Sequence, residues 1–265
     1  MARLQENVSL QPFNTFGLDL NARWFFKVQS PEAALEFLMD NQEAGRPVLI
    51  LGGGSNVLFR SDFPGLVLYN QIKGYTVVKE DGDHVWLKVG AGENWHQLVL
   101  YTLSRNWGGL ENLSLIPGSV GAAPIQNIGA YGVEQKEVFW ELNAIHLTTG
   151  SFCRFIKEEC QFGYRDSIFK RQAKGSYLIY SVTFRLNKKP VLNTSYGAIE
   201  RELKDLGLEP TIHSVSQAVI NIRSRKLPNP AQIGNSGSFF KNPVISPPQF
   251  KVLAESYPDA PHYPQ

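Results

Sequence analysis

Hydrophobic and polar positions follow clear periods in the first part of the chain, and each period predicts an element. Residues 24–28 are mostly aromatic and apolar and predict a strand. Ser30 and Pro31 then supply an N-cap and a first-turn proline, which predict a helix to about Asn41. Residues 48–51 are wholly apolar and predict a short buried strand. The order strand, helix, strand is typical of a βαβ unit.

The same patterns continue in the middle of the chain. Residues 84–89 and 178–186 alternate between apolar and polar positions and predict two strands. Residues 94–104 carry apolar side chains at helical spacing and predict an amphipathic helix. Residues 140–155 predict a hairpin whose turn lies at residues 149–150.

Other parts of the chain show little periodicity. Residues 111–135 are rich in glycine, proline and alanine and nearly uncharged, so they predict a long loop that needs a reason to be ordered. After Pro190 we expect a polar link and then a helix from about Val215 to Ser224. A last helix is expected to begin near residues 247–248.

Length and charge restrict the class of protein. With 265 residues the chain is long enough for a sizeable core and for about two domains of about 150 residues. Its net charge of +2 argues against nucleic acid or a membrane surface as the main partner. The polar N-terminus and the lack of an apolar run of about 18 residues indicate a cytoplasmic protein. Cys153 and Cys160 lack companion cysteines, so we expect free thiols and no metal site.

One glycine-rich segment directly follows the apolar strand at residues 48–51. Glycines without a Cβ let several backbone N–H groups converge on an anion, and a serine and an asparagine add side-chain donors. The segment therefore predicts a phosphate cradle, with a tight strand connection as the alternative. Its residues are Gly52, Gly53, Gly54, Ser55 and Asn56.

A second segment, residues 116–132, combines small residues, stiffening prolines and two amides. A flat heteroaromatic ring with a polar edge would fit against such a surface. A buried loop between domains is the alternative interpretation.

Two further segments carry candidate reactive groups. Arg165 is flanked by aromatic and apolar residues, where a guanidinium would bind a planar carboxylate, although pairing with Asp166 or another acid is the alternative. Gly234 and Gly237 allow unusual backbone angles that would let Ser238 point its hydroxyl into an apolar pocket. That arrangement suggests proton chemistry in a dry site, and a serine-capped turn is the alternative.

Cations near the end of the helix predicted at residues 215–224 complete the candidates. Tyr196 and the basic residues 223–226 would supply further anion contacts. A solvated helix end explains these cations equally well.

Six motifs, taken in order, resemble the UDP-N-acetylenolpyruvoylglucosamine reductases, flavoenzymes of bacterial peptidoglycan synthesis. The motifs lie at residues 14–17, 51–56, 89–95, 116–132, 164–169 and 237–243, and together they cover nearly the whole chain. Tyr196 and the uninterrupted residues 164–170 are similar to the type I branch of this family.

The resemblance implies a fold and a cofactor. The fold would be an α+β, vanillyl-alcohol-oxidase-like FAD-binding fold, with FAD-binding subdomains at residues 1–75 and 76–213 and an incomplete substrate-binding domain at 214–265. FAD would be bound non-covalently, because no histidine or cysteine stands where a covalent link is evident, and NADPH would be the reductant. Residues 52–56 would cradle the FAD pyrophosphate. The other implied FAD contacts are Pro117, Gly118, Ser119, Gly121, Ile125, Gln126, Asn127 and Gly129.

The implied reaction reduces UDP-N-acetylglucosamine enolpyruvate. NADPH would reduce FAD, and the flavin would deliver hydride to C3 of the enolpyruvyl ether, which leaves carbanion character at C2. Arg165 would bind the carboxylate and stabilise this charge. Ser238 would protonate C2, which requires a site that excludes solvent. By resemblance, Tyr196, Lys226 and Asn242 would hold the UDP-sugar or its diphosphate.

One departure separates this sequence from the family pattern. The family also uses a glutamate close to its C-terminus, and no acid of this chain, Glu255 included, lies in a matching motif. The resemblance is therefore to a C-terminally truncated member, for which we expect weak FAD binding and slow or no turnover.

Two alternative functions stay open. One is an oxidase of the same flavin architecture, and the other is a non-catalytic protein whose glycine loops hold a nucleotide. For any of these we expect a monomer that acts on a small molecule.

Overall fold

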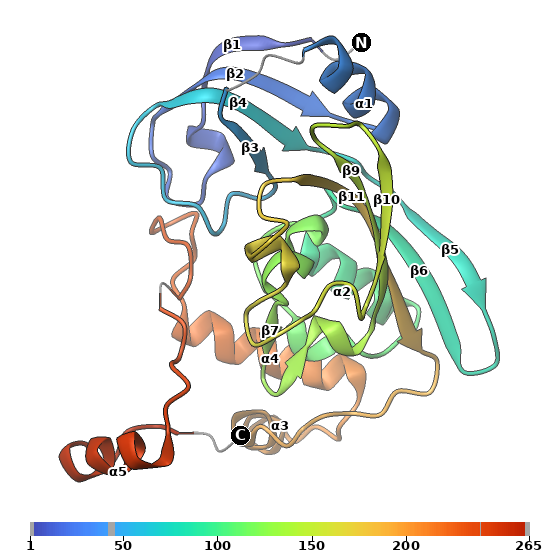
Figure 1. Cartoon of the computed structure of the whole chain (residues 1–265). Helices are drawn as coiled ribbons and strands as arrows, with labels where there is room; N and C mark the ends of the chain where they lie inside the picture. Colours follow the sequence, from blue (N-terminus) through green and yellow to red (C-terminus); the bar gives the residue numbers. More distant parts are fainter. Residues whose placement is uncertain (1–2, 42–45, 239, 263–265) are drawn as a thin grey trace.

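Two β-sheets form the body of the protein in the computed structural model, which describes residues 3–41, 46–238 and 240–262 (Figure 1). The first sheet has the strand order β1-β2-β4-β3. Strand β1 pairs antiparallel with β2, whereas β2 and β3 both run parallel to β4. The strands are β1 (Gln5–Ser9), β2 (Asn21–Val28), β3 (Val48–Leu51) and β4 (Phe63–Asn70), and the short helix η1 (Gln11–Phe13) follows β1.

The predicted βαβ unit lies within this sheet. Helix α1 (Pro31–Asp40) joins β2 to β3, and Ser30 caps it by accepting the Ala33 N–H at 3.1 Å. Strand β4 lies between β2 and β3, and the hydrophobic pattern did not predict β1 or β4.

The second sheet is antiparallel, with the order β10-β9-β11-β6-β5. The predicted hairpin and the strand predicted at residues 178–186 are confirmed as β9–β10 and β11. Helix α2 (Trp95–Ser104) begins after Asn94, as predicted, and packs Trp95 edge-on against Phe184 of the sheet at 5.8 Å. The strands are β5 (Tyr75–Glu80), β6 (His84–Gly90), β9 (Phe139–His146), β10 (Phe152–Ile156) and β11 (Tyr177–Asn187).

Short helical turns order the long segment that lacked periodicity. Buried Trp95 ties the segment to α2, because its indole N–H donates to the Leu113 carbonyl at 2.9 Å. The elements are η2 (Glu111–Leu113), η3 (Val120–Ala122), η4 (Pro124–Gln126), the ribbon β7 (Gly129–Ala130) and β8 (Val133–Glu134), and η5 (Gln135–Glu137), with η6 (Ile168–Lys170) beyond β10.

Three helices follow the second sheet: α3 (Gly197–Leu206), α4 (Ile212–Lys226) and α5 (Pro247–Ser256). Helix α3 lies where the sequence predicted only a polar link. Half of its residues are charged, and its buried Ile199 and Leu203 pack with Val215 and Val219 of α4.

Helices α4 and α5 are confirmed, although α4 begins three residues before Val215. A domain boundary between residues 213 and 214 falls inside α4. We therefore propose that the third domain begins before α3.

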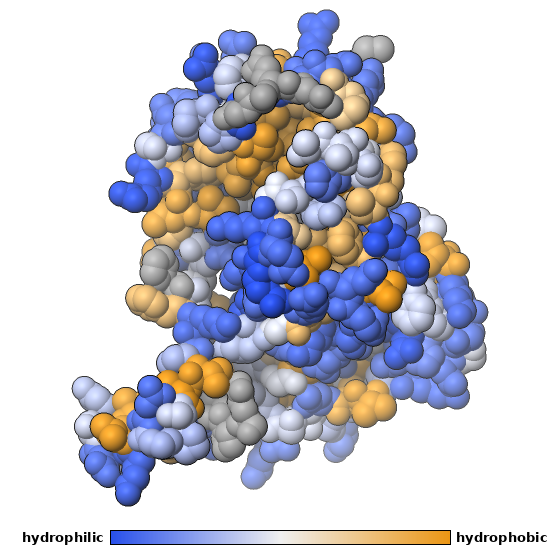
Figure 2. Space-filling view, viewed as in Figure 1, coloured by the Kyte–Doolittle hydropathy of each residue, from blue (hydrophilic) through white to orange (hydrophobic). Residues whose placement is uncertain are grey.

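A small opening lies on the left side of the molecule in the space-filling view, whereas the surface on the right is continuous (Figure 2). Apolar side chains gather above it, in the region of the first sheet, and hydrophilic residues lie below. One apolar cluster of that sheet combines buried Phe25 and Leu51 with half-buried Phe13 and Tyr69. Within the described ranges, no helix is long and apolar enough to cross a membrane.

Candidate active site

The glycine loop after β3 lies tightly against two other segments. A Cβ built on Gly52 would stand 2.1 Å from the Ser119 hydroxyl oxygen, so a larger residue at 52 would displace the second loop. Gly54 has φ +62°, and its Cβ would stand 2.0 Å from the Phe13 carbonyl oxygen. These close approaches explain why the loop is built from glycine.

The second loop is held by the connection between β6 and α2. The Val120 N–H donates to the Glu93 carbonyl at 2.9 Å, and the Gly121 N–H donates to the Ala91 carbonyl at 2.8 Å. A side-chain hydrogen bond then joins the two loops, since Asn56 Nδ2 donates to Gln126 Oε1 at 2.8 Å. The structure therefore brings together the two segments predicted to bind the cofactor.

These loops fit a dinucleotide such as FAD. Glycine backbone that packs closely on Ser119 and Phe13, together with hydroxyl and amide side chains beside it, supplies the kinds of donor that bind a pyrophosphate. Among the predicted contacts, the exposed residues are Gly53, Asn56, Pro117 and Ile125. The half-buried ones are Gly52, Ser55, Gly118, Gln126 and Gly129, and the buried ones are Gly54, Ser119, Gly121 and Asn127.

The side chain of Asn127 does not face the loop surface, as an FAD contact would. Its Nδ2 donates to the Gly163 carbonyl at 2.9 Å, and its Oδ1 accepts the Lys136 N–H at 3.2 Å. Both polar atoms are therefore bonded to backbone, and the side chain is directed at the Gly163 turn instead of the loop surface.

The motif at residues 14–17 joins three distant parts of the chain. The Thr15 N–H donates to the Gly54 carbonyl at 3.2 Å, and Thr15 Oγ1 donates to the Asn235 carbonyl at 2.6 Å. The Asn235 N–H donates in return to the Thr15 carbonyl at 3.1 Å. A Cβ on Gly234 would stand 2.3 Å from the Phe16 carbonyl oxygen. The chain leading to Ser238 is thereby attached beside the first glycine loop.

Arg165 lies at the tip of a tight turn and has a left-handed backbone, with φ +51°. One guanidinium nitrogen, Nη2, donates to the Gly129 carbonyl, and Nη1 lies 3.9 Å from Glu134 Oε1. Asp166 pairs instead with Arg171 Nε at 3.3 Å, so the alternative of pairing with an acid is wrong for Asp166 but holds for Glu134. The Arg165 side chain is 33% exposed, which leaves part of the guanidinium accessible to a carboxylate.

Ser238 does not lie in the apolar pocket that the sequence suggested. The residue is exposed, and the segment around it crosses the surface as an extended chain beyond α4 (Figure 1). Gly237 does adopt the expected positive φ, at +74°. The dry environment is absent because few side chains pack on this part of the chain.

A shared aromatic ring joins the segment around Ser238, which we call the Ser238 segment, to the turn at residues 163–166, which we call the Arg165 turn. Lys241 Nζ lies 5.3 Å from the centre of the Tyr164 ring, and Arg165 Cζ lies 5.3 Å from the same centre. Both distances are in the range of cation–π contacts. The segments that carry the two candidate reactive groups therefore meet at one side chain.

The predicted substrate contacts are more dispersed. Tyr196 precedes α3 and stacks edge-on against Tyr131 at 5.3 Å. Lys226, the last residue of α4, and Asn242 are both exposed. Among the described residues, neither side chain forms a hydrogen bond or ion pair with the Arg165 turn.

The two arginines near the end of α4 make different contacts. Arg225 pairs with Glu202 of α3, with Nη1 at 3.2 Å from Oε1, as a helix-end cation would. Arg223 instead turns inward, and its Nε donates to the Leu115 carbonyl at 3.2 Å. Burial lowers the pKa of Arg223, and its contact with Tyr131 opposes that shift.

Two residues near Arg223 were not predicted. The Leu115 N–H donates to His96 Nδ1 at 3.0 Å, and Leu115 has φ +58°. Burial, followed by the charge of Arg223, lowers the pKa of His96, and burial raises the pKa of Tyr131. His96, Leu115, Tyr131 and Arg223 lie 16 to 127 positions apart in the sequence, so no local pattern signals that they meet.

A family model agrees with the two-loop site. Residues 22–155 match the model of an FAD binding domain. The fold and the paired loops therefore define an FAD-binding flavoprotein.

Relatives narrow this class. The chain is 53% identical over 260 residues to the UDP-N-acetylenolpyruvoylglucosamine reductase of Amoebophilus asiaticus. The matched region covers 97% of this chain and 76% of that protein. It is 47% identical over 262 residues to the enzyme of the same name from Flavobacterium johnsoniae, with 98% and 77% covered. The chain belongs to the UDP-N-acetylenolpyruvoylglucosamine reductase family.

A solved structure supports the fold. The crystal structure of UDP-N-acetylenolpyruvylglucosamine reductase from Thermus caldophilus is similar with a TM-score of 0.67 and 24% identity, over 92% of this chain and 76% of that one. The predicted family, the α+β FAD-binding fold and the FAD cofactor are thus confirmed.

Proposed function

We propose that this chain carries out the NADPH-dependent, FAD-mediated reduction of UDP-N-acetylglucosamine enolpyruvate to UDP-N-acetylmuramate. Membership of the family supports the reaction class. The observation that carries the proposal is the meeting of the Arg165 turn and the Ser238 segment at Tyr164, next to the second cofactor loop.

The cofactor would be held by the chain's own backbone and amides. Residues 52–54 would offer backbone N–H groups to a pyrophosphate, and Ser55 and Asn56 carry side-chain donors beside them. When bound, FAD supplies the two-electron chemistry that links NADPH to the substrate. Residues 117–129 would contact FAD from the side opposite residues 52–56.

Arg165 would bind the enolpyruvyl carboxylate. A guanidinium presents paired donors in a planar fork that matches a carboxylate, and its positive charge is fixed before charge develops at C2. In the described structure its partners are a backbone carbonyl and a carboxylate 3.9 Å away, which a substrate carboxylate would replace.

Ser238 would donate the proton to C2. A hydroxyl is a weak acid in water, so the role requires that the exposed segment be covered when substrate binds. The contact between Lys241 and Tyr164 holds the segment near Arg165. Lys226 and Asn242 are suitable for the diphosphate because both are exposed donors, and Tyr196 would contact the same UDP-sugar.

The biological setting follows from the product, a peptidoglycan precursor. We place the reaction in the cytoplasm, as a step of cell wall biogenesis on which cell shape and cell division depend. We also propose that the chain acts as a monomer on this small molecule, without nucleic acid.

An anaerobic absorbance experiment tests the function. The FAD-loaded chain is mixed with NADPH and then with UDP-N-acetylglucosamine enolpyruvate. Bleaching of the flavin by NADPH and recovery on addition of the enolpyruvyl sugar support the reductase. Bleaching by an alcohol would indicate an oxidase of the same fold, and a flavin that neither reagent changes would indicate a nucleotide-binding protein.

A further inference from the structure

The backbone of the Arg165 turn is closed on itself but strained. The Gly163 N–H donates to the Asp166 carbonyl at 3.0 Å, and the Asp166 N–H donates to the Gly163 carbonyl at 3.3 Å. Between them Arg165 has φ +51°, a conformation that a residue with a side chain adopts only where its surroundings enforce it. Some part of the fold outside the turn must therefore hold it.

Two buried side chains attach this turn to the cofactor loop. Asn127 Nδ2 donates to the Gly163 carbonyl at 2.9 Å, at the start of the turn. Ser167 Oγ donates to the Ile125 carbonyl at 2.6 Å, at its end. Both side chains are fully buried, at 0% exposure. The turn is thus fixed on each side by one hydrogen bond to residues 125–127.

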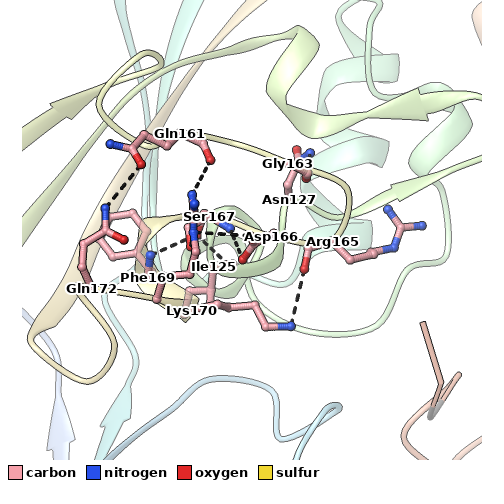
Figure 3. A network of polar contacts seen from close by, with 11 residues as sticks. Ile125, Asn127, Gln161, Gly163, Arg165, Asp166, Ser167, Phe169, Lys170 and Gln172 are labelled. Carbon is pink, nitrogen blue, oxygen red and sulfur yellow. Dashed lines mark hydrogen bonds and ion pairs between the residues drawn. The ribbon is translucent and has the colours of Figure 1, made fainter. Parts of the chain in front are cut away.

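The geometry leaves the guanidinium outside this network. Figure 3 shows Ser167 and Ile125 at the centre of the polar contacts, with Asn127 beside Gly163 and the Arg165 side chain extending away from them. Lys170 Nζ adds a contact to the Arg165 carbonyl at 3.4 Å, also on the backbone. The network therefore holds the backbone on both sides of Arg165, whereas the guanidinium contacts the Gly129 carbonyl and Glu134 outside it.

We propose that Ser167 and Asn127 are positioning residues, which hold the Arg165 guanidinium in register with the cofactor loop so that it meets the substrate carboxylate. This inference rests on the proposed function of Arg165. Because residues 125–127 belong to the loop that would face FAD, the two anchors relate the carboxylate site to the cofactor instead of to the hairpin β9–β10 from which the turn extends. Misplacement of a binding group by about 1 Å is enough to lose much of its effect.

Equilibrium binding of the substrate measures the effect of this positioning on Arg165 without turnover. Oxidised, FAD-loaded protein is titrated with UDP-N-acetylglucosamine enolpyruvate in the absence of NADPH. Ser167→Ala is expected to weaken binding about tenfold, because the turn loses one anchor. Thr102→Val is the matched control: Thr102 is also buried and its hydroxyl donates to the Val99 carbonyl at 2.8 Å, but it lies within α2. This control is expected to bind the sugar as the parent does.

A double-mutant cycle separates positioning from general loosening. Arg165→Met removes the guanidinium and should itself weaken binding strongly. If Ser167 acts through Arg165, adding Ser167→Ala to Arg165→Met changes binding little further. A full tenfold loss in both backgrounds would overturn the positioning role and leave the role of Arg165 intact. If Arg165→Met binds like the parent, the proposed role of Arg165 fails, and the positioning role fails with it.

A second variant and a second readout follow the turn itself. Asn127 has φ +43°, so Asn127→Gly removes the other anchor without adding backbone strain. Faster hydrogen exchange at the Asp166 amide is expected in both Ser167→Ala and Asn127→Gly, and unchanged exchange there in Thr102→Val. Exchange at Asp166 equal to that of the parent in both anchor variants would show that the turn holds itself.

Discussion

Ser238 shows how the role of one residue depends on groups that approach it from elsewhere. The residue is exposed and forms no hydrogen bond in the part of the chain that the structure describes. A hydroxyl in that position is an ordinary weak acid. Its proposed chemistry therefore depends on closure of the segment over a bound substrate.

Ser238→Ala separates the two halves of the reaction. Flavin reduction by NADPH should proceed near the parent rate, whereas reoxidation by the enolpyruvyl sugar should slow by about a hundredfold or more, the usual contribution of a positioned proton donor. Stopped-flow absorbance measures both steps. Ser236→Ala, two positions earlier on the same segment, is the control and should leave both rates unchanged. Equal slowing of the two half-reactions would contradict the proton-donor role.

His96 is expected to titrate below its ordinary pKa of 6.5, because burial and the nearby Arg223 disfavour the imidazolium. Protonation would also break the hydrogen bond from the Leu115 N–H to Nδ1. A lowered folded-state pKa means that the stabilising contribution of His96 is present above pH 6.5 and is lost as the pH falls through the folded pKa. An NMR titration of the imidazole signals measures this pKa, and a value at or above the ordinary one would contradict the described contacts.

At the scale of elements, the first glycine loop depends on contact between segments more than on its own conformation. Gly54 and Gly207 have almost the same backbone angle, with φ of +62° and +64°. A Cβ on Gly54 would strike the Phe13 carbonyl, whereas a Cβ on Gly207 would meet no atom within 4 Å. Substitutions at these two positions therefore distinguish the cost of the backbone angle from the cost of a steric clash.

Gly207→Ala should therefore cost about 1 kcal/mol of unfolding free energy, from the backbone angle alone. Gly54→Ala should cost about 3 kcal/mol or more and should also release FAD, because the loop must shift away from Phe13. Denaturant unfolding and the flavin absorbance retained after gel filtration measure the two effects. Similar unfolding free energies and full flavin retention in both variants would argue against the cradle.

The sequence predicted elements with strong periods and missed those whose pattern is set by tertiary contacts. The apolar run of β3 and the caps of α1 and α2 are local signals, and they were sufficient to predict these three elements. Half of the residues of helix α3 are charged, and the segment was therefore taken for a polar link although its apolar residues lie on one face. The motifs placed Arg165 and Gly54 at the site, but nothing local showed that Asn127 bonds to Gly163 or that Ser238 is exposed, because both depend on segments far away in sequence.

At the scale of the whole molecule, Thr15 connects the FAD-binding part to the chain that carries Ser238. Its hydroxyl donates to the Asn235 carbonyl, and its N–H donates to the Gly54 carbonyl. The glycine loop proposed to bind FAD and the Ser238 segment are therefore both attached to one residue.

Thr15→Val keeps the shape of the side chain and removes the hydroxyl, so the segment after α4 should become more accessible. Limited proteolysis with trypsin should cut faster after Lys241, while the melting temperature changes by only a few degrees. Thr15→Ser retains the hydroxyl and should be cut at the parent rate. Equal cutting of all three proteins would show that this hydrogen bond does not hold the segment.

In the proposed reaction, Arg165 and Ser238 act on the same enolpyruvyl group beside FAD. A crystal structure of the chain with FAD and UDP-N-acetylglucosamine enolpyruvate tests it most directly. We expect the Arg165 guanidinium in paired hydrogen bonds with the substrate carboxylate and the Ser238 hydroxyl directed at C2. A substrate bound with its carboxylate away from Arg165, or with Ser238 still in solvent and remote from C2, would contradict the claim.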